Sequence, residues 1–300
     1  MIHMKLASAL LLILATGAVH AALNVFACEP EWGALAQEVG GGDVNVYTAT
    51  TGLQDPHHIQ ARPSLIAKMR QADLVLCTGA ELEIGWLPVL LSESGNTKVQ
   101  PGQAGYFEAA RHVALLEIPS SLDRSQGDIH AAGNPHIQTD PRIIARIAGP
   151  LAQVMAQIDG AHAAEYAQRE QAFQSRWAQA VKTWEVKAAP LKGVPVAMQH
   201  DGFPYLESWL GLKRVVVLEP KPGVEPSVAY LATVLEKLKA EPAKMVIRAA
   251  YQSDRPSVWL AERAGIRAVV LPFTVGGDAQ AGDLYSLFDD TVERLLAGLK

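Results

Sequence analysis

The chain has 300 residues, of which 49% are apolar, and its formal net charge is −5 at neutral pH. This apolar fraction is ample for a packed core, and the length suits two domains of ordinary size. The basic residues form no stripe along the sequence, which argues against nucleic acid or an anionic membrane surface as the partner.

Residues 1–21 have the features of a cleaved secretory signal peptide. Lys5 supplies a positive charge, the apolar run from Leu6 to Val19 is too short to span a membrane comfortably, and Ala21 offers a small residue for cleavage. We expect a mature chain that begins near Ala22 and is exported to the periplasm. The alternatives are an uncleaved anchor and a lipid anchor at Cys28, which is disfavoured because it lies inside the first predicted strand.

Strand-like apolar runs at 23–27, 44–49, 73–77 and 113–118 alternate with helical segments at 31–39 and 63–71. This alternation predicts right-handed βαβ units and a parallel sheet with helices on both faces, in a first α/β lobe over residues 22–160. Cys28 and Cys77 lie near the ends of runs that could be neighbours in this sheet. Either a disulfide or two small buried side chains fits this pair.

Residues 117–135 interrupt the pattern. The segment is polar, contains glycine and has no period, so we expect a mobile surface loop. It carries Asp123, Asp128 and His130 just ahead of His136. The loop is therefore either a solvated insertion or a segment that samples metal and passes it inward.

A long helix is predicted from about His162 to Lys187, after a first helix over 143–158. Its apolar side chains form a single stripe, made of Tyr166, Phe173, Trp177, Val181 and Trp184. At 1.5 Å per residue, roughly 26 residues make a rod of about 39 Å. We expect residues 161–190 to link two lobes, and a single rigid link of this kind implies only small hinge motions.

Residues 191–300 restart the α/β pattern. Strands are predicted at 194–198, 215–218, 245–247 and 267–271, and helices at 201–210, 228–240, 256–264 and 284–299, with Asp201 as a reasonable N-cap of the first. The predicted fold class is therefore α/β. It consists of two doubly wound lobes joined by one long rigid helix, with a ligand site in the cleft between the lobes.

Two segments echo each other, from Asp55 to Pro63 and from Asn134 to Pro141. Each places a histidine, His57 or His136, directly after a proline and close before an Ile-Gln pair. Proline fixes its own φ and restricts the residue before it, so each histidine leaves a stiff connection. The adjacent His58 could compete with His57.

His57, His136, His200 and Asp278 each follow the carboxyl end of a predicted strand, where open α/β sheets bind ligands. Three imidazoles and a carboxylate suit tetrahedral zinc, whereas manganese and calcium favour more oxygen ligands. A closed set of four would hold the ion without using it chemically. If Asp278 does not bind, the fourth position is open to water and an enzyme becomes more plausible.

These segments resemble those of the TroA-like family, the zinc-binding solute receptors of ABC importers, over essentially the whole mature chain. The family pattern D-P-H-x-[YF]-x-x-x-P is met by Asp55–Pro63, with Ile59 where an aromatic residue is common. The segment usually written D-P-H-x-W-x-D-P appears as Asn134–Pro141 with asparagine first, and His200–Tyr205 resembles H-D-A-F-x-Y. A strand-loop element with Asp73, Gly79, Glu83 and Trp86 matches as well.

The resemblance implies capture of a divalent ion outside the cytoplasm and its delivery to a membrane permease, without catalysis. His200 favours zinc, because manganese receptors of the family tend to carry glutamate at that position. The family aspartate lies before the last helix, where Asp278 and Asp283 are both candidates. Asp278 is preferred because Asp283 suits the helix N-cap. We expect a monomer, and a metallochaperone is a further candidate partner.

Other functions remain open at this point. A manganese receptor of the same family is one alternative. Another is an exported zinc hydrolase, for which Glu219 is the loop carboxylate that we nominate as general base, although no H-E-x-x-H element occurs. A receptor for haem or a metal chelate and a metal-dependent adhesin are the others.

Overall fold

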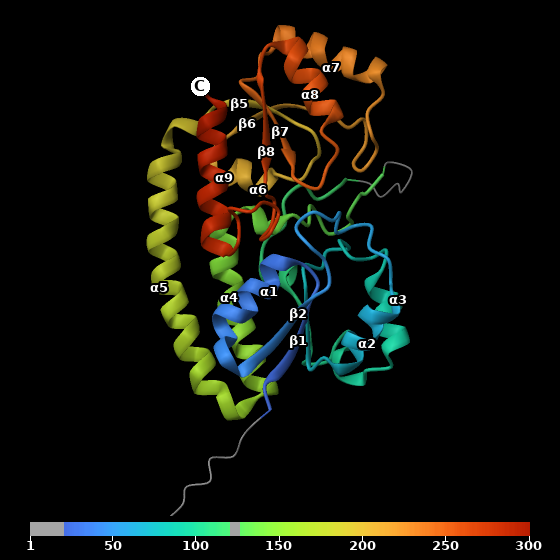
Figure 1. The fold of residues 1–300 in the computed structure, drawn as a ribbon, viewed down its shortest axis with the longest axis vertical. Coiled ribbons are helices and arrows are strands. Elements are labelled where there is room, and N and C mark those ends of the chain that lie inside the picture. The colour runs from blue at the N-terminus through green and yellow to red at the C-terminus, as the bar shows by residue number, and fades with distance from the viewer. Residues whose placement is uncertain (1–20, 121–126) are drawn as a thin grey trace, which may run out of the picture.

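The structure, a computed structural model, describes residues 21–120 and 127–300. The predicted signal peptide, up to residue 20, and Asp123 of the polar loop therefore lie outside the described residues. Within them the chain forms two α/β lobes, one above the other in Figure 1, with a long helix beside both. The predicted fold class is confirmed.

Each lobe contains a parallel four-stranded sheet. The N-terminal sheet has the order β2-β1-β3-β4, made of β1 (Leu23–Ala27), β2 (Val44–Thr48), β3 (Leu74–Cys77) and β4 (Tyr106–Glu108). The C-terminal sheet has the order β6-β5-β7-β8, made of β5 (Pro195–Met198), β6 (Lys213–Val217), β7 (Met245–Ala249) and β8 (Arg267–Leu271). In both sheets the order reverses beside the first strand, which places a ligand crevice at the carboxyl ends there.

Helices cover both faces of each sheet. Those of the N-terminal half are α1 (Pro30–Gly40), α2 (Pro63–Gln71), α3 (Leu87–Ser94) and α4 (Pro141–Ile158). Those of the C-terminal half are α6 (Pro204–Leu210), α7 (Val228–Ala240), α8 (Arg255–Ala264) and α9 (Leu284–Gly298). Helix α5 (Ala163–Ala188) lies between the two sets in the sequence. Within the described residues, every helix is too short or too polar to cross a membrane.

Helix α5 contacts both lobes along its length (Figure 1). Of its predicted stripe, Tyr166, Phe173, Trp177 and Trp184 are almost fully covered, and Val181 is half-buried. Its polar side chains also reach both lobes: Arg176 pairs with Glu38 of α1, and Lys187 pairs with Glu293 of α9. The predicted linking helix is thus confirmed, while the domain boundaries at 160 and 190 stay predictions.

The fourth strand of the first sheet is not where the sequence placed it. The apolar run 113–118 forms no strand, and Tyr106–Glu108 takes the open edge of β3 instead, with Val75 opposite Tyr106. Residues 113–118 are largely exposed and run toward the second lobe, where the Leu116 N–H donates to the Tyr205 hydroxyl at 2.9 Å. An apolar run without a free sheet edge beside it does not become a strand.

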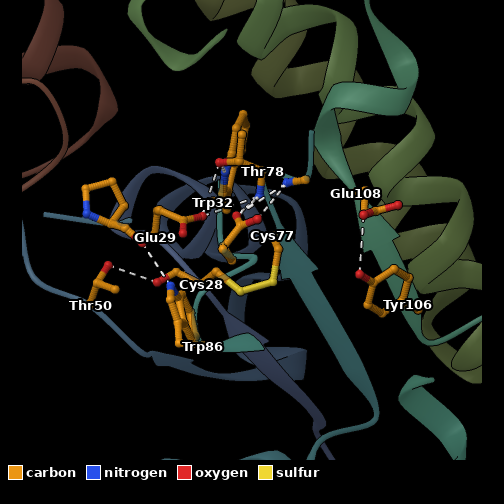
Figure 2. Close-up of a disulfide and its surroundings, with 12 residues drawn as sticks. Cys28, Glu29, Trp32, Thr50, Cys77, Thr78, Trp86, Tyr106 and Glu108 are labelled. Carbon is orange, nitrogen blue, oxygen red and sulfur yellow. Dashed lines mark hydrogen bonds between the residues drawn. A yellow bond between two sulfur atoms is a disulfide. The ribbon is translucent and has the colours of Figure 1, made fainter. Parts of the chain in front are cut away.

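Cys28 and Cys77 form a disulfide, with a Cα–Cα distance of 4.8 Å (Figure 2). The two residues meet because β1 and β3 are neighbours, and the Cys28 N–H donates to the Leu76 carbonyl. Both cysteines are fully buried. Of the two alternatives left open for this pair, the structure shows the disulfide, and the thiol of Cys28 is not free.

Candidate metal centre

Three buried histidines meet between the lobes. His57, His136 and His200 each offer one ring nitrogen, and these nitrogens all lie within 4.8 Å of one another. Their exposed fractions are 8%, 1% and 6%. Among the described residues one other group is as close, Cys28, Cys77 and Glu83, and its cysteines are bonded to each other.

His57 follows β2, in a loop that two contacts hold in place. Asp55 Oδ1 accepts hydrogen bonds from the His57 main-chain N–H at 3.0 Å and from its ring Nδ1 at 2.8 Å. Burial alone would raise the pKa of Asp55, but these bonds outweigh it and hold the pKa below its usual value. The ring therefore points its other nitrogen, Nε2, into the site, where it is buried without a partner.

The second contact on this loop comes from Trp86, whose indole N–H donates to the Pro56 carbonyl at 2.8 Å. Trp86 is placed by the turn after β3, in which Gly79, Ala80 and Glu81 all have positive φ. A non-glycine residue adopts this conformation only when its surroundings hold it there.

The carboxylate of Glu83 holds this turn by accepting the N–H groups of Thr78 at 2.7 Å and Gly79 at 3.1 Å. Beside it, Thr78 also donates to Glu29 next to the disulfide (Figure 2). Burial raises the pKa of Glu83 to about 7, and burial together with the charge of Glu83 raises the pKa of Glu29 well above its ordinary value.

His200 follows β5, and Glu219 follows the neighbouring strand β6. The strand register pairs Met198 with Val217, so these two side chains leave the sheet side by side. Glu219 Oε2 lies 2.7 Å from His200 Nδ1 and also accepts the Gly223 N–H at 2.9 Å. Burial lowers the pKa of His200, but the hydrogen bond and charge of Glu219 outweigh it, so the pKa is raised.

His136 lies in the connection to α4, just before a short 3-10 helix at Ile137–Thr139. The sequence predicted that His136 follows the end of a strand, and this prediction is wrong because His136 lies in the connection instead. Burial, followed by the nearby His57 and His200, lowers the pKa of His136 well below its ordinary value. Its Nδ1 is buried and has no hydrogen-bond partner within the described part of the chain, and its Nε2 lies 3.4 Å from His200 Nε2.

The spacing of these nitrogens fits one small ion. Zn–N bonds of about 2.0–2.1 Å at tetrahedral angles place two ligand nitrogens about 3.3–3.4 Å apart. The 3.4 Å between His136 Nε2 and His200 Nε2 meets that requirement, and a ring nitrogen of His57 lies within 4.8 Å of a ring nitrogen of each. A neutral imidazole whose Nδ1 is held by a carboxylate presents Nε2 as a fixed, strengthened ligand.

The structure does not bring Asp278 to the histidines. Its carboxylate pairs with Arg294 of α9 at 2.9 Å and accepts the Gln280 N–H at 3.1 Å. Gly277, the residue before Asp278, packs against the Pro272 carbonyl so closely that a side chain there would clash. Asp283 forms the capping box of α9 with Ser286, as predicted.

Pockets formed by the described residues include the histidines in their lining. One, of about 150 Å³, includes His130, His136 and His200 in its lining, and the other, of about 250 Å³, includes His57, His200 and Glu219. Both are below the roughly 300 Å³ at which sites for drug-sized ligands begin. The ring of His130 lies 5.3 Å from that of His57, centre to centre. The site suits a bare ion better than haem or a chelate.

Comparison with known proteins gives the family. The family described as "ZnuA: Zinc-uptake complex component A periplasmic" matches residues 25–298. The chain belongs to this family. The zinc-binding lipoprotein AdcA of Streptococcus pneumoniae is 24% identical over 276 residues, covering 89% of this chain. This chain spans 53% of the length of AdcA, about half.

Manganese proteins are also among the relatives of this ZnuA-family chain. The manganese ABC transporter substrate-binding lipoprotein PsaA of Streptococcus pneumoniae is 21% identical over 88% of this chain and 85% of PsaA. A solved crystal structure of ZnuA has a TM-score of 0.78 at 20% identity, over 93% of this chain and 100% of that one. The structural likeness shows that the fold is shared.

Sequence reasoning missed the roles of Asp55 and Glu219 in this ZnuA-family site. Asp55 stands two residues before His57, a spacing at which aspartate commonly bonds the backbone ahead of it, so its contact was predictable. Glu219 was nominated as a general base, but it holds His200 instead. Finding that required knowing that β6 lies beside β5. The predicted N-cap, Asp201, contacts Arg214, and α6 begins only at Pro204.

Proposed function

We propose that this chain is an extracytoplasmic receptor that captures a zinc ion between its lobes and delivers it to the permease of an ABC transporter. The ligands are the Nε2 atoms of His57, His136 and His200. The observation that carries the proposal is the convergence of these buried nitrogens within 4.8 Å of one another. The zinc-binding name of AdcA and the family description point the same way.

Zinc is favoured over manganese by the ligand atoms. Three imidazole nitrogens suit a borderline ion, whereas manganese prefers a site richer in oxygen. The nearest carboxylates, Asp55 and Glu219, are each engaged by the Nδ1 of a histidine, so they are not free oxygen ligands in this arrangement. The manganese relative PsaA makes discrimination between the two ions the first point to measure.

Asp278 remains our proposed fourth ligand, and binding requires that it leave Arg294. The side chains of Asp278 and Arg294 are each about 30% exposed. Exposed ion pairs contribute little to stability, so Asp278 can leave Arg294 and bind a zinc ion at a small cost in free energy. If Asp278 stays with Arg294, water occupies the fourth position.

The same contacts support our proposal that the protein binds the ion without catalysis. A zinc hydrolase needs a free base beside the metal-bound water. Glu219, the carboxylate nominated for that role, is committed to His200 and Gly223. We also propose a monomer in the periplasm, exported by a cleaved signal peptide, with a metallochaperone as a further partner. A zinc-dependent hydrolytic turnover would overturn the receptor assignment.

The test is titration calorimetry of the mature protein with zinc and with manganese, alongside metal content after purification. His57→Ala, His136→Ala and His200→Ala should each lose at least about 10-fold in zinc affinity, the scale found even for groups behind the ligands. His112→Ala is the matched control, because its ring stacks on Phe107 outside the site. The assignment fails if all three variants bind zinc like the parent.

Asp278→Ala tests the fourth position separately. If Asp278 is a ligand, this variant loses affinity on the same scale as the histidine variants. If it binds zinc like the parent, the fourth ligand is water and the three histidines hold the ion alone. An Arg294→Ala variant sharpens the comparison, because it frees Asp278 and should increase zinc affinity only when Asp278 is a ligand.

A further inference from the structure

We propose that Asn134 fixes the separation of His136 and His200 across the two lobes and thereby sets the affinity of the metal site. The inference rests on the zinc-binding function proposed above, and it makes Asn134 a positioning residue rather than a ligand. Asn134 stands two residues before His136, and its side chain bonds the residue that follows His200. It therefore touches both ligand segments at once.

Both ends of the Asn134 side chain are used. Its Oδ1 accepts the main-chain N–H of His136 at 3.0 Å, and its Nδ2 donates to the Asp201 carbonyl at 2.8 Å. The same Nδ2 donates to Glu117 Oε2 at 3.1 Å. Asp201 belongs to the C-terminal lobe, whereas Asn134 and Glu117 belong to the N-terminal half, so one amide joins the two.

Three further contacts reinforce this joint. The Tyr205 hydroxyl donates to the Asn134 main-chain carbonyl at 2.7 Å, and the Arg214 guanidinium contacts the carboxylates of both Glu117 and Asp201. Glu117 has a φ of 54°, a conformation that a non-glycine residue adopts only when its contacts hold it there. We call Asn134, Glu117, Asp201, Tyr205 and Arg214 the clasp.

The clasp closes a short ring through two of the ligands. From Asn134 the chain runs through Pro135 to His136, and from Asp201 it runs directly to His200. The 2.8 Å hydrogen bond joins one end of the ring, and the 3.4 Å gap between the two Nε2 atoms lies at the other. A movement at the hydrogen bond therefore changes the gap. Metal–ligand distances tolerate only about 0.2 Å, so affinity responds to such a movement.

The chemistry at position 134 requires an amide. Asp55 bonds both the main chain and the Nδ1 of His57 through its carboxylate, but Nδ1 of His136 has no hydrogen-bond partner among the residues that the structure describes. What Asn134 supplies instead is a donor, because both groups facing its Nδ2 are oxygens. Aspartate at this position would set a second carboxylate about 3 Å from that of Glu117, where the two repel.

The test uses Asn134→Asp in the full mature chain, with zinc affinity measured by competition against a chelator. We expect a loss of at least about 10-fold, since groups that orient ligands contribute on this scale. Adding Glu117→Gln to this variant removes the repulsion and should restore part of the affinity. A merely structural role for Asn134 predicts no such rescue.

Asn96→Asp is the matched control. Asn96 is buried, whereas Asn134 is half-buried, and it makes a similar pattern of bonds. Its Oδ1 accepts the Lys98 N–H at 3.0 Å, and its Nδ2 donates to the Met69 and Ala72 carbonyls at 3.0 and 2.7 Å. All these groups lie within the N-terminal lobe. Asn96→Asp should lower the melting temperature, while its zinc affinity stays within about twofold of that of the parent.

A second readout needs no metal. Spin labels on cysteines introduced at Val89 and Val228, which are 48% and 68% exposed on α3 and α7, report the distance between the lobes. In the metal-free state Asn134→Asp should broaden this distance distribution, and Asn96→Asp should leave it unchanged.

The proposal is overturned if Asn134→Asp binds zinc like the parent and keeps a narrow distance distribution, or if Asn96→Asp loses as much affinity. Absence of zinc binding in the parent would refute the proposed function instead. In that case the spin-label distances still decide whether Asn134 joins the lobes.

Discussion

Two of the three histidines are oriented by a carboxylate on Nδ1. Asp55 holds His57 at 2.8 Å and Glu219 holds His200 at 2.7 Å. Each bond fixes the tautomer and leaves Nε2 as the ligand atom. For His200 the same carboxylate also raises the pKa, so a proton competes more strongly with the ion at mildly acidic pH.

Glu219→Gln should therefore change zinc binding in two ways. Above pH 7 the affinity should fall about 10-fold, because the ligand is less firmly held. On the acid side, loss of the charge lowers the pKa of His200, so the pH at which binding is half lost should move down. Competition titrations from pH 5 to 8 measure both effects.

The control for this prediction is Glu225→Gln, which removes a carboxylate from the lining of the same pocket. It should reproduce the parent profile. An unchanged acid limb in Glu219→Gln would show that its carboxylate does not control the protonation of His200.

At the scale of elements, the turn after β3 links the core of the N-terminal lobe to the site. The disulfide joins β1 to β3, and Glu83 holds the turn that follows β3. Trp86, which follows this turn, donates a hydrogen bond to Pro56 in the loop of His57. The chain-entropy model assigns a cross-link between residues 49 apart roughly 4 kcal/mol of stability.

Replacement of both cysteines by alanine should thus lower the free energy of unfolding by about 2–4 kcal/mol. Urea titrations of the metal-free protein measure it, and the disulfide-free variant should still bind one equivalent of zinc at 25 °C. Loss of zinc binding in a variant that remains folded would mean that the disulfide itself positions His57.

Buried carboxyl groups give this lobe a pH-dependent stability. Glu31 of α1 is buried, and Thr274 of the other lobe contacts its carboxyl group. Burial raises the pKa of Glu31 to about 7. Because the unfolded chain ionises near 4.5, the native state binds more protons between these values, and stability falls as the pH rises.

Glu31→Gln removes this contribution, which is on the order of 1–3 kcal/mol between pH 5 and 7.5. The free energy of unfolding, measured with a chelator present, should fall less over that range than in the parent. Glu185→Gln, on the exposed face of α5, should behave like the parent. The prediction is wrong if the free energy of unfolding changes by the same amount from pH 5 to 7.5 in the parent and in Glu31→Gln.

At the scale of the molecule, the lobes are joined on several sides. Helix α5 pairs with α1 through Arg176 and with α9 through Lys187, and the clasp joins the lobes at the rim of the site. The lobes also meet where the backbone of Gly52 packs against that of Gly276 and Gly277, so closely that a side chain at position 52 would clash.

Metal binding should consequently cause only a modest adjustment of loops and lobes. The radius of gyration, about 19 Å for a compact chain of roughly 280 residues, should change by less than about 1 Å between the metal-free and zinc-loaded protein. Small-angle scattering of the two forms measures it. A wide clamshell rotation would show that these contacts break on release of the ion.

The sequence by itself determined most of the fold and the three candidate ligands. Helix α5 was recognisable because its aromatic residues recur on one face, and His57 and His136 were recognisable because prolines repeat around them. These are local signals, since periodicity and backbone stiffness depend only on neighbours in the chain.

Only the tertiary structure decided which groups surround the histidines. Glu219 lies beside His200 because β6 pairs with β5, and Asp278 pairs with Arg294 of α9 instead of joining the histidines. Residues 113–118 form no strand because β4 already covers the edge of β3. Each of these outcomes depends on which distant segments become neighbours, and that is set by packing of the whole chain rather than by any local pattern.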